Sequence, residues 1–170
     1  GICNDMNEPA TGRHPPERMR FDRGRASHER YHNQYALLMA MGTVAGLHAA
    51  QPDQRTFVLS RAGFSGIQRY AANWMGDNQA RWDHLWVSMP MACGFGLSGQ
   101  PFVGADIGGF QGDTNPELFL RWMQMGVLTP FCRNHSETNN VDQYPWSFGP
   151  EIHDLAREAV RLRYRLMPYI

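Results

Sequence analysis

The sequence lacks several features that would place it in a broad class at once. No apolar run approaches the roughly 20 residues that a bilayer-spanning helix needs, and the N-terminal residues show no basic segment followed by an apolar one. Acidic and basic residues balance at 16 each, so the overall charge indicates neither a nucleic-acid partner nor an anionic membrane surface. The cellular compartment and the oligomeric state stay open.

Cysteine is also scarce, with three residues in a chain of 170. Cys3, Cys93 and Cys132 are far apart, odd in number and form no C-x-x-C pair. This pattern argues against a zinc site and against a disulfide framework. We expect the three cysteines to be small buried thiols.

Five short segments have the character of strands that end in polar residues. The apolar and β-branched residues at 56–59 predict a strand that is buried on both faces. The same shape recurs at 101–110 and 127–136, more weakly at 70–78, and at the N-terminal GICND. The polar residues at the predicted strand ends are Asp5, Arg61, Asp77, Asp106, Arg133 and His135.

Helical patterns lie between these strands. Apolar residues recur at helical spacing in four segments, which are 27–50, 83–93, 116–125 and 152–162. The alternation predicts an α/β fold with a parallel sheet. A doubly wound sheet would also fit, but charged residues at successive strand ends favour a (β/α)8 TIM barrel, because a barrel directs all those ends at one point.

The chain is shorter than a complete barrel, which needs about 250 residues. It supplies about five of the eight strands. We therefore expect residues 1–170 to be a fragment of a (β/α)8 barrel.

Two aspartates stand out as a pair with different surroundings. Asp77, in NWMGDN, follows a tryptophan and a methionine, and a carboxyl group shielded by apolar side chains retains its proton as a general acid must. Asp5, in DMNEP, has several possible hydrogen-bond donors nearby and should remain ionised. Glycoside hydrolysis uses such a pair. The competing interpretation, that each aspartate caps a helix, is weakened by the recurrence of aspartate at strand ends.

Five sequence blocks carry a resemblance to a known family. The blocks NDMNEP, FVLSRAGFSGIQRYAANWMGDN, GADIGGF, PFCRNHS and LRYRLMPYI resemble the signature blocks of the retaining α-glucosidases of glycoside hydrolase family 31. They occur in the order of that family and cover nearly the whole chain. The resemblance implies that residues 1–170 are a fragment of a single catalytic (β/α)8 barrel domain, with roughly strands four to eight and their helices, and that the N-terminal strands are absent.

The resemblance also implies roles for individual residues. Asp5 corresponds to the catalytic nucleophile and Asp77 to the acid/base. The implied substrate-binding residues are Met6, Arg61, Trp74, Asp106, Phe110, Arg133 and His135. Glu8 is expected to support the nucleophile loop through hydrogen bonds. No metal and no organic cofactor is implied.

The activity that the resemblance implies is hydrolysis of terminal α-glucosidic bonds in oligosaccharides or maltose-like substrates. The configuration would be retained through a covalent glycosyl-enzyme intermediate. Related activities remain open, namely those of an α-xylosidase and of an α-glucan lyase. A carbohydrate-binding relative without catalysis is disfavoured by the presence of both aspartates.

Two further patterns have simpler interpretations. HERYH at 28–32 matches the H-E-x-x-H motif of a zinc metalloprotease. No glutamate occurs between His32 and Glu117 to act as the usual third ligand, so zinc is the distant alternative. Four arginines in the last helical segment predict a solvated face, and they are Arg157, Arg161, Arg163 and Arg165.

Overall fold

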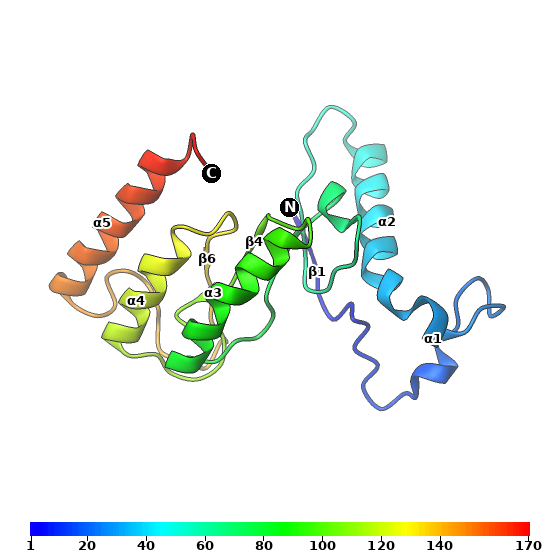
Figure 1. Cartoon of the computed structure of the whole chain (residues 1–170), viewed down its shortest axis with the longest axis horizontal. Coiled ribbons are helices and arrows are strands. Elements are labelled where there is room, and N and C mark those ends of the chain that lie inside the picture. The colour runs from blue at the N-terminus through cyan, green and yellow to red at the C-terminus, as the bar shows by residue number, and fades with distance from the viewer. The chain divides into compact units, whose positions relative to one another are not determined.

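The computed structural model describes all residues 1–170 and divides into two compact units, Gly1–Asn73 and Trp74–Ile170. Each unit has its own hydrophobic core. Strands and helices alternate along the chain in the predicted order (Figure 1). None of the helices combines the length and the apolar character that a membrane span requires.

The first unit is built on three parallel strands, β1 (Ile2–Asn4), β2 (Val58–Ser60) and β3 (Ala72–Trp74). The central strand β2 pairs with both neighbours, with Ile2 opposite Val58 and Leu59 opposite Ala72. The boundary between the two units falls within β3. The predicted strand at 56–59 therefore begins two residues before the observed strand, because pairing with β1 begins at Val58.

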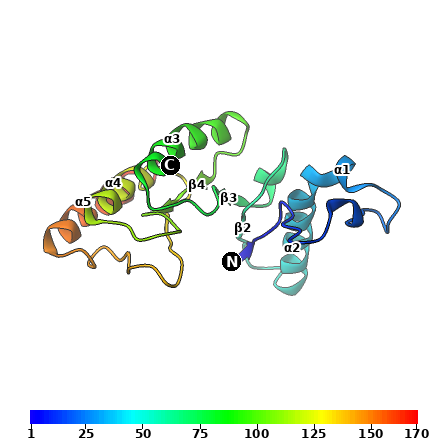
Figure 2. The same ribbon diagram turned by 90° about the horizontal axis from the view of Figure 1, so that it is seen from below.

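One long helix packs beside these strands. Helix α2 (Tyr35–Ala50) buries alanines on the side that faces the core, and this small core contains Ala36, Ala40, Val58, Ile67 and Ala71 (Figures 1 and 2). The predicted helix at 27–50 is interrupted. It consists of α1 (His28–Tyr31), the 3-10 turn η2 (His32–Gln34) and α2. Two more 3-10 turns, η1 (Pro16–Arg18) and η3 (Ile67–Arg69), lie in the connections.

The second unit contains three long helices and three very short strands. The helices are α3 (Trp82–Leu97), α4 (Pro116–Gly126) and α5 (Pro150–Leu166). The strands are β4 (Val103–Gly104), β5 (Asp106–Ile107) and β6 (Arg133–Asn134). Strands β5 and β6 pair in parallel, with Asp106 opposite Arg133.

The core of the second unit is formed mainly by α4 and α5, which lie side by side (Figures 1 and 2). Helix α4 begins as predicted, because Pro116 occupies its first turn and the Asn115 side chain accepts a hydrogen bond from Leu118 N at 3.0 Å. The largest of the buried side chains in this core are Trp122, Phe119, Ile107, Leu118 and Val127.

Two predicted strands are shorter than their apolar runs. The run at 127–136 begins as the C-terminal turn of α4, and only Arg133–Asn134 forms a strand. The run at 101–110 is divided into β4 and β5. One residue, Ala105, separates the end of β4 from Asp106, which begins β5.

The cysteines differ from the expectation of buried thiols. Cys3 and Cys93 are exposed, Cys132 is half-buried, and no disulfide joins them. Burial raises the pKa of the Cys132 thiol, and the nearby charge of Arg163 acts in the opposite direction.

Arg163 is not part of a solvated face, in contrast to the prediction. Its guanidinium donates to the backbone oxygens of Val127 at 2.9 Å, Thr129 at 2.6 Å and Pro130 at 2.9 Å. These carbonyls follow α4 and have no partner within the helix, and a cation is favourable at that end. Arg163 therefore fastens the segment that leads into β6.

Replacing Arg163 with methionine should lower the free energy of unfolding by about 2–3 kcal/mol, since charged hydrogen bonds to buried carbonyls would be lost. Denaturant unfolding of the full-length gene product would measure this change. Arg161→Met is the matched control, because Arg161 lies on the same helix and bonds only Glu158 at the surface. Equal effects of the two substitutions would contradict the anchoring role of Arg163.

Candidate active site

Parallel pairing brings two predicted site residues together in the first unit. Asn4 lies opposite Ser60, so Asp5 and Arg61 leave neighbouring strands at the same level. The Arg61 amide donates to the Asn4 carbonyl at 3.0 Å. The Arg61 guanidinium lies 3.7 Å from Asp5 Oδ1, and its Nε donates to Glu8 Oε1 at 2.5 Å. One cation thus contacts two carboxylates, and Glu8 makes the closer contact with it.

The backbone after Asp5 is held in an uncommon conformation. Met6 has φ of 57°, which non-glycine residues rarely adopt and which costs about 1–3 kcal/mol. Its amide donates to Asp5 Oδ1 at 2.8 Å, so this turn fixes one oxygen of the carboxylate. The Met6 side chain is 59% exposed and is accessible to a ligand.

A buried asparagine joins the loops that follow β1 and β2. The Asn7 side chain is 1% exposed. Its Nδ2 donates to Ser60 Oγ at 2.8 Å, and its Oδ1 accepts from the Ala62 amide at 2.9 Å. Sequence reasoning did not select Asn7, because its partners are more than 50 residues away in the chain.

The second unit holds a buried ion pair. Arg133 Nη2 and Nε donate to Asp106 Oδ1 at 2.7 and 3.1 Å, and Asp106 is fully buried. Burial raises the pKa of Asp106, while the positive charges of Arg133 and His135 oppose that shift and the charge of Asp77 adds to it. These interactions bring four of the predicted residues into one electrostatic neighbourhood. Asp106 Oδ2 is buried and has no hydrogen-bond partner in the chain.

Aromatic rings of Trp74 and Phe131 lie against the Arg133 guanidinium, and a stacked aromatic pair lies in the same unit. The Arg133 guanidinium lies over the ring of Trp74, 5.2 Å from its centroid, and Trp74 is only 3% exposed. The rings of Phe110 and His135 are stacked with centroids 5.2 Å apart and an angle of 24° between their planes. Phe110 is half-buried and His135 is exposed, so this stacked pair is accessible from solvent.

Asp77 lies in a tight turn after β3. Gly76 has φ of 75° and allows the turn that the sequence predicts. The Asp77 side chain is exposed. The expectation that Trp74 and Met75 shield its carboxyl from water was therefore wrong, because Trp74 is directed into the interior beneath Arg133.

The residue after Asp77 anchors the turn. Asn78 is 8% exposed, and its Nδ2 donates to the Asp106 carbonyl at 2.9 Å. Its Oδ1 accepts from the Phe110 amide at 3.0 Å. Asn78 therefore ties the Asp77 turn to the segment after β5. Sequence reasoning missed Asn78 as it missed Asn7.

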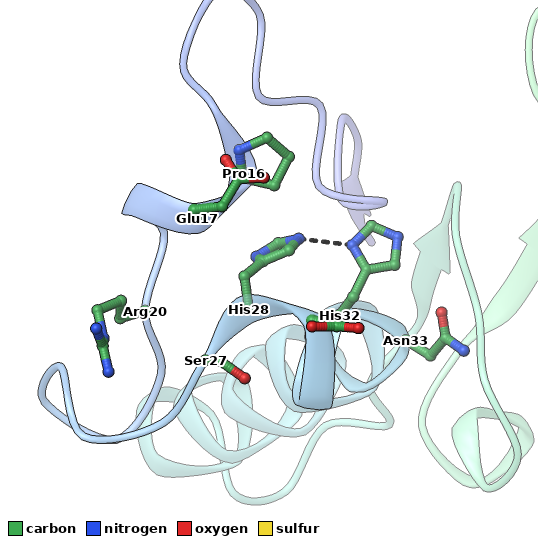
Figure 3. A pocket seen from close by; sticks show the side chains of 8 residues that line it. Pro16, Glu17, Arg20, Ser27, His28, His32 and Asn33 are labelled. Atoms are coloured by element: carbon green, nitrogen blue, oxygen red, sulfur yellow. Dashed lines mark hydrogen bonds between the residues drawn. The ribbon is translucent and has the colours of Figure 1, made fainter.

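The histidine pair of HERYH does not have the geometry of a zinc site. His28 Nε2 and His32 Nδ1 are 2.7 Å apart and share a hydrogen bond (Figure 3). Tetrahedral zinc would hold two nitrogen ligands about 3.3 Å apart, with both lone pairs directed at the metal. No group of three possible metal-ligating side chains occurs in the structure. The pair lines a cavity of about 540 Å³ together with residues such as Glu17 and Arg20 (Figure 3).

The chain matches the family described as glycosyl hydrolases family 31, TIM-barrel domain, over residues 1–170. It therefore belongs to that family, and its fold is that of an α/β TIM-barrel domain with parallel strands.

The curated relatives are α-glucosidases. The chain is 43% identical to alpha-glucosidase 2 of Bacillus thermoamyloliquefaciens, over 100% of this chain and 22% of that protein. It is 46% identical to a probable glucan 1,3-alpha-glucosidase of Oryza sativa subsp. japonica, over 99% of this chain and 19% of that protein. The chain thus spans about a fifth of the length of these relatives.

A solved structure agrees with these relatives. The fold is similar to that of a glucosidase II alpha subunit bound to Glc1Man2, with a TM-score of 0.90 and 38% identity. This match covers 98% of the chain and 19% of that subunit. The names of these relatives do not favour the xylosidase, lyase or metalloprotease alternatives.

The hydrogen bonds of Asn7 predict the effect of a nearly isosteric substitution. In Asn7→Asp, a carboxylate oxygen would replace Nδ2 against Ser60 Oγ, whose own hydrogen is already donated to the Ala62 carbonyl at 2.8 Å. The buried charge would lack a donor there, and we expect a loss of about 3 kcal/mol in the free energy of unfolding. Denaturant unfolding of the full-length gene product would measure the loss.

Asn139→Asp is the control for this substitution, since it makes the same chemical change at an exposed position. It should change stability by less than about 0.5 kcal/mol. A loss at Asn7 no larger than the loss at Asn139 would show that the bridge between the two loops is unimportant.

Proposed function

We propose that the chain provides the catalytic centre of a retaining α-glucosidase that removes terminal glucose from oligosaccharides. The main support is the family match over residues 1–170, with α-glucosidases among the relatives. The two aspartates of the family's signature blocks are both present, as Asp5 and Asp77. In this proposal the five predicted strand segments correspond to strands four to eight of one catalytic barrel domain.

The proposed reaction proceeds in two steps. In the first, Asp77 donates a proton to the glycosidic oxygen while Asp5 attacks the anomeric carbon from the opposite face, which breaks the glycosidic bond and forms a glycosyl ester. In the second, Asp77 takes a proton from water, and that water displaces Asp5 from the anomeric carbon. Two inversions restore the α configuration. No metal or organic cofactor takes part.

The environment of Asp5 suits a nucleophile. Its carboxylate is half exposed, accepts a hydrogen bond from the Met6 amide and lies beside the Arg61 guanidinium. Glu8 binds the same guanidinium more closely than Asp5 does. We infer that Glu8 positions Arg61, so that Arg61 orients the sugar and Asp5 without neutralising the nucleophile in a tight ion pair.

The remaining residues would hold the first sugar. Asp106 Oδ2 is a buried acceptor without a donor, and a sugar hydroxyl that reached it would remove the cost of leaving it unpaired. Arg133 fixes Asp106 and is itself a hydrogen-bond donor to hydroxyls. The stacked Phe110 and His135 offer an apolar face beside a polar edge, and Met6 is proposed as a further apolar wall. Trp74, which is buried, is proposed to act on the sugar through the Arg133 guanidinium that lies over its ring.

The exposed position of Asp77 suits a residue that must reach the glycosidic oxygen of a substrate. Its side chain is exposed in the second unit. We infer that a bound sugar covers Asp77 and excludes bulk water from it during the reaction.

Asp5→Asn in the full-length gene product should reduce turnover of maltose by about a thousandfold or more, because an amide is a poor nucleophile. Asp53→Asn is the matched control, since Asp53 is an exposed aspartate in the same unit. Release of glucose from maltose measures both. Near-normal hydrolysis by a correctly folded Asp5→Asn protein would refute the assignment of the nucleophile.

Asp77→Asn should affect substrates according to their leaving groups. Maltose needs protonation of its departing oxygen, whereas an activated aryl α-glucoside such as the p-nitrophenyl compound departs without it. We therefore expect a loss in kcat/KM that is at least about a hundredfold larger for maltose. Equal losses on the two substrates would exclude Asp77 as the general acid.

A further inference from the structure

Two exposed aromatic rings are stacked on each other in the loop between β6 and α5. The ring centroids of Tyr144 and Trp146 are 5.2 Å apart, and the ring planes are within 3° of parallel. The two residues are 52% and 65% exposed. The two rings together leave a patch of apolar surface in water, and exposed apolar patches of sufficient size mark binding sites.

The loop holds these rings in a fixed arrangement. The Ser147 amide donates to the Tyr144 carbonyl at 2.9 Å, which closes a turn with Pro145 at its second position. The two rings therefore occupy the first and third positions of a turn whose backbone is restricted by proline. Little side-chain freedom remains to be lost when a ligand binds to rings held in this way.

The rest of the loop is tied to the segment after β5. Gln143 Nε2 donates to the Gly109 carbonyl at 2.9 Å, and Asn140 Nδ2 donates to the Phe110 carbonyl at 2.7 Å. The Val141 amide donates to Asp113 Oδ1 at 2.8 Å. The stacked rings are thus carried by a loop that is anchored to the same segment as Phe110.

A polar cavity adjoins Tyr144. This cavity has a volume of about 230 Å³ and is lined by Asn134, His135, Ser136, Asp142, Gln143 and Tyr144. Trp146 covers one face of the Tyr144 ring, and both residues keep more than half of their surface exposed to a ligand. A pyranose ring presents C–H groups on its faces and hydroxyls around its edge. An aromatic face beside amide, carboxylate and imidazole groups matches that pattern.

Other exposed aromatic residues of this unit lack such a setting. Trp86 on α3 is 72% exposed and Tyr164 on α5 is 74% exposed. Neither lines the cavity that Tyr144 shares with His135. The combination of a stacked pair, an anchored loop and an adjacent polar cavity is specific to Tyr144 and Trp146.

We propose that Tyr144 and Trp146 form an accessory sugar-binding platform. The platform stacks against a sugar unit of the oligosaccharide next to the one held by His135, and it makes the enzyme prefer substrates of more than one sugar. This inference rests on the proposed function for the identity of the ligand. Tyr144 and Trp146 are positioning residues that do not take part in the chemical step.

The test compares two substrates in the full-length gene product. Maltotriose reaches beyond the first sugar, whereas p-nitrophenyl α-glucoside contains one sugar only. Trp146→Ala should lower the ratio of kcat/KM for maltotriose to kcat/KM for the aryl glucoside by about tenfold, which is typical for truncating an aromatic anchor. Tyr144→Ala should act in the same direction. Tyr144→Phe keeps the ring and should leave the ratio within about twofold of the wild type.

The possible outcomes separate this inference from the proposed function. An active wild type whose ratio is unchanged by both alanine variants would overturn the platform alone. If the wild type cleaves neither substrate, the proposed function fails. Calorimetric binding of maltotriose to the wild type and to Trp146→Ala then tests the platform by itself. Weaker binding by Trp146→Ala supports the platform, and equal affinity overturns it. Should Trp146→Ala not fold, Tyr144→Ala provides the same test, because each change removes one ring of the stack.

Discussion

Parallel pairing of very short strands is the constraint on which the site depends. Each pair has only two or three residues in register, yet that register decides which side chains emerge together. Asn4 opposite Ser60 brings Asp5 beside Arg61, and Asp106 opposite Arg133 places a buried acid against its cation. A shift by one residue would turn alternate side chains to the other face of the sheet and separate these pairs.

Strands this short do not fix such a register by themselves, and side-chain amides supply the missing contacts. Asn7 bridges the loops after β1 and β2, and Asn78 bridges the Asp77 turn to the segment after β5. Both amides use a donor and an acceptor at once, which neither aspartate nor leucine could do. Their burial makes these bonds costly to lose. Asparagine in this fold therefore defines loop geometry, while the neighbouring aspartates remain available for chemistry.

The sequence predicts the order of elements and the polar strand ends well, because apolar runs followed by charge are local patterns. It predicts strand bounds less well. The run at 127–136 is apolar because it closes a helix against the core, and its composition resembles that of a buried strand. Arg163 looked like one of four solvated arginines, but three carbonyls more than 30 residues away bind it. Such partners depend on tertiary structure, which periodicity does not encode.

We propose that Asp5 and Asp77 act on opposite sides of one glycosidic bond. The most direct measurement is the separation of their carboxyl groups in a crystal structure of the full-length gene product with a bound sugar. A retaining mechanism predicts that the two carboxyl groups lie about 5–5.5 Å apart across the substrate. A separation of about 6.5–9.5 Å would indicate an inverting mechanism. Carboxyl groups divided by packed side chains would show that Asp5 and Asp77 are not a catalytic pair.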